Sequence, residues 1–382
     1  MKAIIVGGSV GGLMAALLLR KIGWDVTVYE RAVGDLAGRG AGLGVSQELL
    51  DVMARAGAPF ERSAGIAQAA HVWMERDGSI AYEHRRNLMA SAWARVYQPL
   101  RAALPAASYR HAMVLERVDG TTAVFADGSR DTADLIVGAD GVYSTVRRQF
   151  LPDVQPRLAN YVAWRGIIEE KEVPPETLEA VSGRIVFCFP PKEMLLSMRV
   201  PGGVYFIWYR GVADLKELFT DASGKDHGMS IPPPLIRTEF VAEMKMHALD
   251  VLPAPIAAVV QKAPQPLLQA ISDMESPRLT FGRVALLGDA AFVVRPHVAG
   301  GAGKAAMDAR CLADVLQSER SIEAALAAYE QKQLDFGARI VRHSRYLGAD
   351  LEGRPTQRDP RRIIDNYGAP NILHDVDLSR FG

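Results

Sequence analysis

The sequence predicts an α/β protein of two lobes, one with a parallel sheet and one with a mainly antiparallel sheet, followed by a long helix. Strand-helix patterns typical of a parallel sheet occupy the start of the chain and return near residue 283. Between about residues 160 and 212, strand-like stretches follow one another without helices. With 382 residues, the chain is also longer than one compact core usually grows.

The first thirty residues have the layout of a dinucleotide-binding βαβ unit. Residues 2–6 favour a buried strand, 13–19 favour a helix, and a second strand over 25–29 ends in Glu30. The turn between them consists of Gly7, Gly8, Ser9, Val10, Gly11 and Gly12. Glycines let this backbone approach a pyrophosphate, and the helix N-terminus offers free N–H groups. Glu30 is expected to accept hydrogen bonds from ribose hydroxyls, and Ser9, at the second glycine position, is small enough for the loop. The alternative is a tight βα turn without a ligand.

Charge and cysteine content exclude several classes of protein. Lysine plus arginine equal aspartate plus glutamate, 44 each, which gives no reason to expect nucleic acid or an acidic membrane as partner. Cys188 and Cys311 are too few for a disulfide framework, lack metal-ligand spacing and are expected to be buried apolar residues. No signal peptide precedes the first strand and no apolar run is long enough to span a bilayer, so a cytoplasmic protein is expected.

The remaining elements can be placed along the chain. The first part is expected to contain a glycine-rich loop over 31–45, a helix over 46–57, strands at 71–74 and 79–82, a helix over 94–104, strands at 113–115, 122–125 and 133–137, and a helix near Ser144. The second part is expected to contain strands at 161–168, 184–189, 194–199 and 204–210, a loop over 223–234, helices over 235–249 and 254–262, a buried strand over 283–289, and helices over 304–316 and 321–347. The tail after Asp350 is expected to be irregular.

Three glycine-containing loops follow buried strands, at residues 7–12, 138–141 and 288–301. Each places small residues and an acidic residue at or near a strand end. The carboxyl ends of parallel strands meet at one edge of a sheet, so the three loops are expected to converge on one ligand. A nicotinamide dehydrogenase needs only the first loop. Three loops therefore favour a longer ligand that stays bound.

The stretches GGSVGG…E, DLIVGADGVYSTVR and RVALLGDAAFVVRPHVAGGAGKAAMDARCLADVL resemble the FAD-dependent aromatic hydroxylases. These are the single-component flavoprotein monooxygenases typified by p-hydroxybenzoate hydroxylase, and the resemblance covers nearly the whole chain. Residues 161–167, residues 295–301 and Ser9 look like the dihydroxypyridine hydroxylase subgroup. The resemblance implies a Rossmann-like FAD-binding domain formed by 1–70, 96–158 and 276–320, a substrate lobe formed by 71–95 and 159–275, and a C-terminal helix and tail over 321–382.

The resemblance also implies a role for matching positions. Residues 7–12 and Glu30 would hold the ADP half of FAD, Asp140 and Gly141 would contact FAD or a pyridine nucleotide, and Asp289 the ribityl or ribose portion. Pro296 would lie beside the isoalloxazine, with Ala299, Gly300, Gly301 and Ala302 beneath its N1–C2=O edge, where a helix N-terminus favours the charge of reduced flavin. Further cofactor positions are expected at Arg31, Arg39, Gln98 and Leu115. Two positions depart from the family: Gln98 replaces a frequent arginine, and Phe292 replaces a frequent histidine and suggests an apolar wall.

The chemistry that the resemblance implies needs bound FAD together with NADH or NADPH and O2 as co-substrates. A flavin C4a-hydroperoxide would hydroxylate a small electron-rich aromatic, with a hydroxypyridine-type N-heterocycle expected. Such a ring reacts best when deprotonated, and His297 and Tyr209 are the catalytic candidates, although His297 is as well explained by packing. The expected pocket residues are Tyr205, Trp208, Arg210, Phe292 and Pro296. Alternation places Tyr205 and Tyr209 on one face of a strand and Trp208 and Arg210 on the other.

Several alternatives stay open at this point. Arg165 is explained either by an anionic ligand or by a sheet edge. A flavoprotein oxidase or dehydrogenase on the same fold, or a nucleotide-binding protein without catalytic activity, would carry much of the same pattern. A homodimer is common among such hydroxylases.

Overall fold

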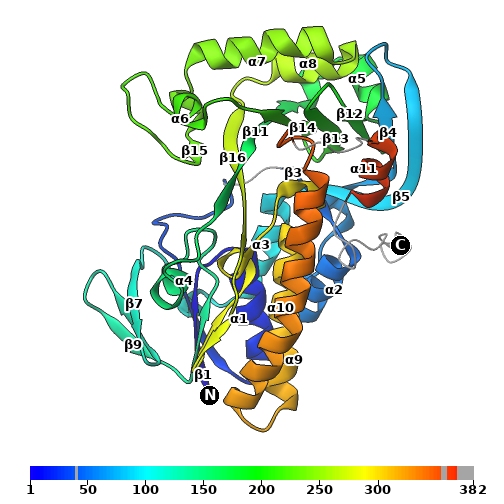
Figure 1. The fold of residues 1–382 in the computed structure, drawn as a ribbon. Coiled ribbons are helices and arrows are strands. Elements are labelled where there is room, and N and C mark those ends of the chain that lie inside the picture. Colours follow the sequence, from blue (N-terminus) through cyan, green and yellow to red (C-terminus); the bar gives the residue numbers. More distant parts are fainter. Residues whose placement is uncertain (39–41, 354–358, 368–382) are drawn as a thin grey trace.

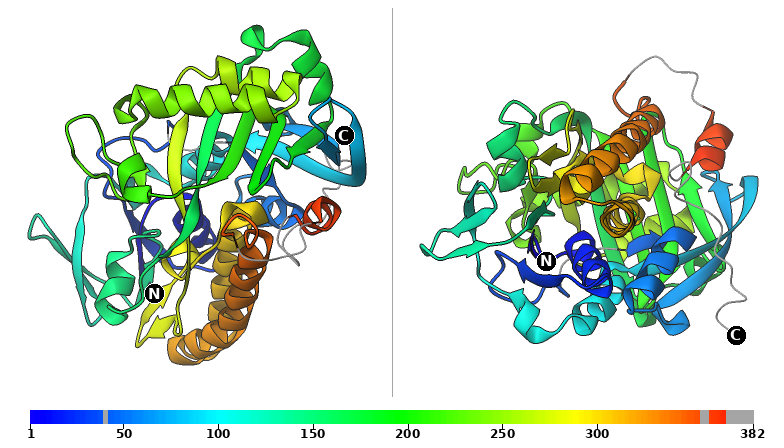
Figure 2. Two further views of the ribbon diagram at one scale, coloured as in Figure 1. Left: turned by 45° about the horizontal axis from the view of Figure 1, so that its top comes forward. Right: turned by 90° about the horizontal axis from the view of Figure 1, so that it is seen from below.

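The computed structural model describes residues 1–38, 42–353 and 359–367, and places two large sheets one above the other (Figure 1). The lower part contains the N-terminal strands and the pair of helices α9 and α10. The upper part contains the second sheet, with α7 and α8 on its far side (Figure 2). The α/β fold, the mainly antiparallel second sheet and the long C-terminal helix are confirmed.

The lower sheet has six strands in the order β17-β18-β10-β1-β2-β6. Its strands are β1 (Lys2–Val6), β2 (Asp25–Tyr29), β6 (Tyr109–Arg110), β10 (Leu135–Gly138), β17 (Thr280–Phe281) and β18 (Val284–Leu286). All neighbours pair in parallel except β17 and β18. The three predicted glycine loops follow β1, β10 and β18, and they therefore lie at one edge of the sheet.

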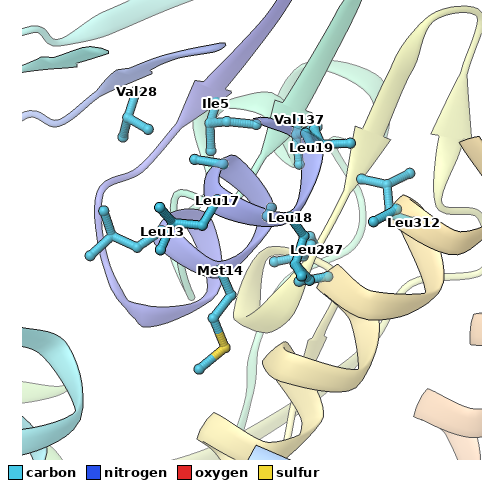
Figure 3. Close-up of a cluster of buried hydrophobic side chains, with 14 of the residues drawn as sticks. Ile5, Leu13, Met14, Leu17, Leu18, Leu19, Val28, Val137, Leu287 and Leu312 are labelled. Carbon is cyan, nitrogen blue, oxygen red and sulfur yellow. The ribbon is translucent and has the colours of Figure 1, made fainter. Parts of the chain in front are cut away.

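Helices cover one side of this sheet because their apolar faces pack together around α1. They are α1 (Val10–Lys21), α2 (Gln47–Ala56), α3 (Trp93–Ala103), α9 (Gly301–Ser318) and α10 (Ile322–Leu347). Leu13, Leu17 and Leu18 of α1 belong to the largest core, where Leu18 lies on the side of α9 and Leu13 on the side away from it (Figure 3). A small sheet of β7 (Leu115–Asp119), β8 (Thr122–Phe125) and β9 (Arg130–Thr132) and the short helix α4 (Thr145–Phe150) complete the lower part.

The upper sheet has ten strands, nine of them in the order β15-β16-β11-β14-β13-β12-β4-β5-β3, with β19 paired to β16. They are β3 (Gly42–Val45), β4 (Gly65–Met74), β5 (Ile80–Ala92), β11 (Arg157–Glu169), β12 (Arg184–Cys188), β13 (Glu193–Val200), β14 (Gly203–Gly211), β15 (Ser230–Ile231), β16 (Leu267–Glu275) and β19 (Phe292–Val293). Only β12 and β4 pair in parallel. On the outer side lie α5 (Pro175–Ala180), α6 (Leu215–Leu218), α7 (Thr238–Val251) and α8 (Ala254–Lys262).

Three expectations about local structure were wrong, and one strand was not predicted at all. The predicted loop over 31–45 ends in β3, which pairs with β5, because its last residues are extended at the sheet edge. Residues 267–275 form β16, which no element was predicted to occupy. The predicted loop over 223–234 contains β15, whose Ile231 is buried against β16. The tail expected to be irregular contains α11 (Pro360–Asn366), capped by the side chain of Asp359.

The chain also passes between the two large sheets more often than the predicted domain division assumes. β3 and the first residues of β4 were placed in the cofactor domain, yet they pair within the ten-stranded sheet. Across the described ranges, no helix has both the length and the apolar composition that a membrane crossing requires.

Candidate active site

One cavity of about 490 Å³ lies between the loop edge of the lower sheet and the inner face of the upper sheet. Its floor contains residues from all three glycine loops, among them Gly11, Gly141 and Asp289. Its roof contains side chains of β11, β13, β14 and β16. The predicted convergence of the three loops therefore holds, and it brings them to one cavity.

The turn after β1 is shaped by close contact with the neighbouring strands. Gly7 has a φ of 106°, and a side chain there would place its Cβ 2.3 Å from the carbonyl oxygen of Ala139. Glu30 is buried, and its carboxylate accepts hydrogen bonds from the backbone N–H groups of Gly8 and Ala32, both at 2.8 Å. Each carboxylate oxygen keeps a further lone pair, so Glu30 can still accept a ribose hydroxyl.

The side chain of Asp140 stabilises the N-terminus of α4. Its carboxylate accepts hydrogen bonds from the Ser144 hydroxyl at 2.5 Å and from the backbone N–H groups of Thr145 and Val146 at 2.7 and 3.2 Å. Burial raises the pKa of Asp140, and these hydrogen bonds oppose that rise. Asp140 does not line the cavity among the described residues, whereas its neighbour Gly141 does.

Asp289 lies in the loop after β18, and its side chain is exposed to the cavity. The protein around its carboxyl group raises its pKa through burial. The backbone of the preceding residue, Gly288, is held by two buried charged side chains of α9. Its N–H donates to Asp308 Oδ2 at 2.9 Å, and its carbonyl accepts from Lys304 Nζ at 3.0 Å. Lys304 and Asp308 are paired at 2.7 Å. No pattern in the sequence predicted this pair of charged contacts to Gly288.

The loop before α9 brings backbone N–H groups to the cavity. Ala299 has a left-handed conformation with a φ of 46°, and the chain then enters α9 at Gly301. Pro296, Ala299, Gly300, Gly301 and Ala302 all line the cavity. The N-terminus of an eighteen-residue helix therefore meets the cavity wall, where its unpaired N–H groups and dipole favour a negative charge.

Alternation along β14 decides which predicted pocket residues reach the cavity. Tyr205 and Tyr209 line it, as does Ile207 between them. Trp208 and Arg210 were also expected in the pocket, but they lie on the opposite face. Trp208 is buried in the core beneath α7 and α8, and Arg210 forms ion pairs with Glu193 and Glu243, the latter on α7.

His297 lies behind the cavity wall and does not line it. Its Nε2 is 2.5 Å from the Tyr161 hydroxyl, and its ring packs edge-on against Tyr209 with centroids 4.6 Å apart. Burial, together with Arg295 and His343, lowers the pKa of His297 to about 3. Burial raises the pKa of Tyr209 well above its ordinary value. Neither group is therefore a strong base at neutral pH.

The remaining predicted positions are dispersed. Phe292 is buried against Gly337 of α10 and does not line the cavity, so it is not the expected apolar wall. The side chains of Gln98 and Arg31 are exposed, and Leu115 is buried in the lower core. Arg39 lies outside the described residues.

Three further aromatic residues, Tyr143 among them, line the cavity although no pattern in the sequence placed them there. Trp93 comes from the start of α3. Tyr367 follows α11, and its ring packs against Phe187 with centroids 4.9 Å apart. The C-terminal segment therefore returns to the roof, which only the tertiary structure reveals.

Comparison with known proteins identifies the family. Two family models match the chain, one described as FAD binding domain-like over residues 158–273 and one described as FAD binding domain over residues 268–344. A 2,6-dihydroxypyridine 3-monooxygenase of Paenarthrobacter nicotinovorans is 30% identical over 388 residues, with 96% of each protein covered. The chain belongs to the FAD-dependent monooxygenases.

This monooxygenase is also similar to a 6-hydroxynicotinate 3-monooxygenase of Bordetella bronchiseptica, at 27% identity over 366 residues with 89% of each chain covered. The solved structure of 2,6-dihydroxypyridine-3-hydroxylase from Arthrobacter nicotinovorans has a TM-score of 0.89 at 27% identity, and 99% of both chains is covered. The family resemblance expected from the sequence is confirmed.

The floor of the monooxygenase cavity fits FAD on its own geometry. The turn after β1 has no room for a side chain at Gly7, Gly8 or Gly12, Glu30 keeps free lone pairs, and the α9 N-terminus faces the cavity. These features match, in order, a pyrophosphate, a ribose and the negatively charged edge of a reduced flavin.

Proposed function

We propose that this protein is an NAD(P)H- and O2-dependent FAD monooxygenase that hydroxylates a small electron-rich aromatic, specifically a hydroxypyridine-type N-heterocycle. The main observation behind this proposal is that one cavity lies between loops suited to FAD on its floor and aromatic side chains on its roof. Two relatives are named as monooxygenases of 2,6-dihydroxypyridine and of 6-hydroxynicotinate, and these names support the substrate class. A cytoplasmic location and a homodimer belong to the same proposal.

The roles of the floor residues follow from the chemistry of the cofactor. The turn over residues 7–12 and Glu30 would hold the ADP half, Asp289 the ribityl or ribose portion, and residues 299–302 the N1–C2=O edge of the flavin. Bound FAD, reduced by NADH or NADPH, supplies the activation of O2 that places one oxygen atom on the ring and releases the other as water.

The roof residues would orient the substrate and exclude water. Tyr205, Ile207 and Tyr209 present two phenol rings and one aliphatic side chain to the cavity, and Leu196 and Met198 of β13 extend this apolar surface. A flat ring would pack between this roof and the flavin ring, with its reacting carbon directed at the floor. Exclusion of water protects the activated oxygen from unproductive decay.

The proposal is tested by NAD(P)H oxidation with FAD-loaded protein, with and without 2,6-dihydroxypyridine, run beside simple phenols. We expect strong stimulation by the hydroxypyridine and a product that carries one atom from ¹⁸O2, measured by mass spectrometry. Stimulation by phenols alone would keep the monooxygenase and remove the substrate class. Turnover without NADH or NADPH would favour an oxidase, and absence of turnover with every compound would favour a binding protein without catalytic activity.

A matched pair of substitutions on β14 tests the position of the pocket. Ile207→Trp fills the roof of the cavity, so we expect FAD content to stay near that of wild type while stimulation by substrate falls about tenfold or more. Arg210→Gln changes the outer face of the same strand and should leave substrate stimulation within about twofold. Equal loss in both variants would contradict the assignment of the inner face as the substrate site.

A further inference from the structure

Arg165 is a cationic side chain in the roof of the cavity. It lies on β11, where its direct partner across the antiparallel ladder is Ile207 of β14. Directly paired residues share one face of a sheet, so Arg165 lies on the inner face between the positions of Tyr205 and Tyr209. It lines the cavity together with these three β14 residues.

Arg165 differs from the other arginines around the site because the described residues give it no hydrogen-bond or ion-pair partner. Its Nε is buried and unpaired. Arg295 is paired with Asp273 and Glu352, and Arg210 with two glutamates. Arg147 donates to two backbone carbonyls. A buried polar group without a partner is costly, so an unpaired guanidinium in a cavity wall indicates a ligand that supplies the partner.

The side chains around Arg165 cannot neutralise its charge. Tyr205, Tyr209 and Tyr367 face it, and burial raises the pKa of all three, which keeps them as neutral phenols although Arg165 opposes the rise. Among the described lining residues the one carboxylate is Asp289, which belongs to the floor and forms no ion pair with Arg165. The positive charge of the roof is therefore available to a bound molecule.

The same lining contains no histidine among the described residues, and His297 behind it is a weak base. A cavity with a free cation and no strong base suits a ligand that already carries negative charge. We infer that Arg165 is the anion-binding residue of the substrate site, and that the substrate binds as a ring oxyanion or through a ring carboxylate. This inference rests on the proposed function and specifies the charge of its substrate.

The test is a binding measurement without turnover. FAD-loaded protein is titrated with 2,6-dihydroxypyridine under anaerobic conditions and without reductant, and the change in flavin absorbance gives Kd across a pH series. In wild type we expect binding to strengthen as the ligand ionises. Arg165→Gln should weaken binding of the anion about ten- to a hundredfold and flatten this pH dependence. Arg165→Lys keeps the charge without the planar fork and should be intermediate.

Two controls separate this result from a general loss of structure. Arg157→Gln removes an exposed arginine from the same strand and should leave Kd unchanged. FAD content and the urea midpoint of each variant show whether the fold is intact, and Arg165→Lys keeps the test decisive if Arg165→Gln fails to bind FAD. Unchanged anion binding in the intact variants would overturn the inference, as would a wild-type protein that binds neither anionic ligand.

A second ligand pair distinguishes the two sources of negative charge. If Arg165 binds a carboxylate, Arg165→Gln should weaken binding of 6-hydroxynicotinate and leave binding of 6-hydroxynicotinamide unchanged. If it binds a ring oxyanion, the large effect should occur with 2,6-dihydroxypyridine. Anion binding through Arg165 without any hydroxylation would retain the inference and contradict the proposed monooxygenase reaction. Hydroxylation by Arg165→Gln with unchanged Kd would support the monooxygenase reaction and contradict the inference.

Discussion

Lys304 is fully buried, and its ammonium group donates hydrogen bonds to one carboxylate and one carbonyl oxygen. It binds Asp308 and the carbonyl of Gly288, while Asp308 accepts the N–H of the same glycine. Both backbone polar groups of Gly288 are thus held by a pair of charged side chains four residues apart on α9. The pair fixes the turn from which Asp289 reaches the cavity.

Removing one member of this pair should be costly at the level of stability and of cofactor binding. For Lys304→Met we expect a loss of about 3 kcal/mol of unfolding free energy, because Asp308 is left as an unpaired buried charge. FAD affinity should fall about tenfold or more, as measured by titration of apoprotein. The double variant Lys304→Met/Asp308→Leu should recover part of the stability but not the FAD affinity. Full recovery of both would show that this pair does not position the turn.

Residues were predictable where their type is tied to one task. Gly7 and Glu30 stand out in the sequence because a glycine turn and a strand-terminal acid have few other uses. The Lys304–Asp308 pair looks like any surface pair at helical spacing, since sequence does not reveal its burial. The predicted alternation along β14 was right. Trp208 and Arg210 were nevertheless expected in the pocket, because each face of the strand carries buried aromatic residues.

At the scale of elements, α10 connects the two parts of the molecule. It runs beside α9 along the lower part and ends near the upper sheet (Figure 1). Its Gly337 packs directly against the ring of Phe292, which precedes the loop that forms the cavity floor. A side chain at this glycine would place its Cβ 2.3 Å from the ring, so the backbone of α10 lies directly against Phe292.

Gly337→Ala should therefore destabilise the protein even though alanine favours a helix. The gain of about 1 kcal/mol in helix propensity is opposed by displacement of a buried ring, which costs about 1–3 kcal/mol or more. We expect a lower urea midpoint and weaker FAD binding. Gln331→Ala, at an exposed position of the same helix, should change stability by less than about 0.5 kcal/mol. A Gly337→Ala protein more stable than wild type would contradict this packing argument.

Elements were predictable where periodicity is strong and uninterrupted. The helix expected over 254–262 has those bounds in α8, and the helix expected over 321–347 corresponds to α10. The strand β16 was missed because polar residues interrupt its apolar positions, and its pairing with β11 depends on tertiary contacts. The short helix α11 was missed because its stretch reads as a charged tail.

At the scale of the whole molecule, charged side chains join distant segments beside the cavity. Arg295 of the floor loop and Arg345 of α10 both bind Asp273 of β16, and Arg295 also binds Glu352 after α10. Three regions of the chain are thereby joined through one buried carboxylate. Two buried histidines, His71 and His297, add a dependence on pH to the stability of the fold.

Burial lowers the pKa of His71 to about 3, and His297 behaves in the same way. In the unfolded chain each binds a proton below about pH 6.5, whereas the folded protein excludes that proton until about pH 3. Stability should therefore fall as the pH drops from about 6.5 towards 3, by at most about 1.4 kcal/mol per pH unit for each histidine.

The pH effect can be isolated by comparing wild type with His71→Met in urea titrations between pH 7.5 and pH 5. His71 packs edge-on against Phe187 and Tyr367, so an apolar residue of similar size keeps most of this contact. We expect a shallower loss of stability on acidification in the variant, whatever its stability at pH 7.5. Parallel losses in the two proteins would show that His71 does not contribute.

The alternation of inner and outer residues along β14 affects how the sequence of such a protein can evolve. Phe206 and Trp208 pack into the outer core, while Tyr205, Ile207 and Tyr209 line the cavity. Substitutions at these odd-numbered positions can thus reshape the cavity without touching the contacts of Phe206 and Trp208 with the outer core. The roof is a surface on which new specificity can evolve while its anchoring side is left untouched.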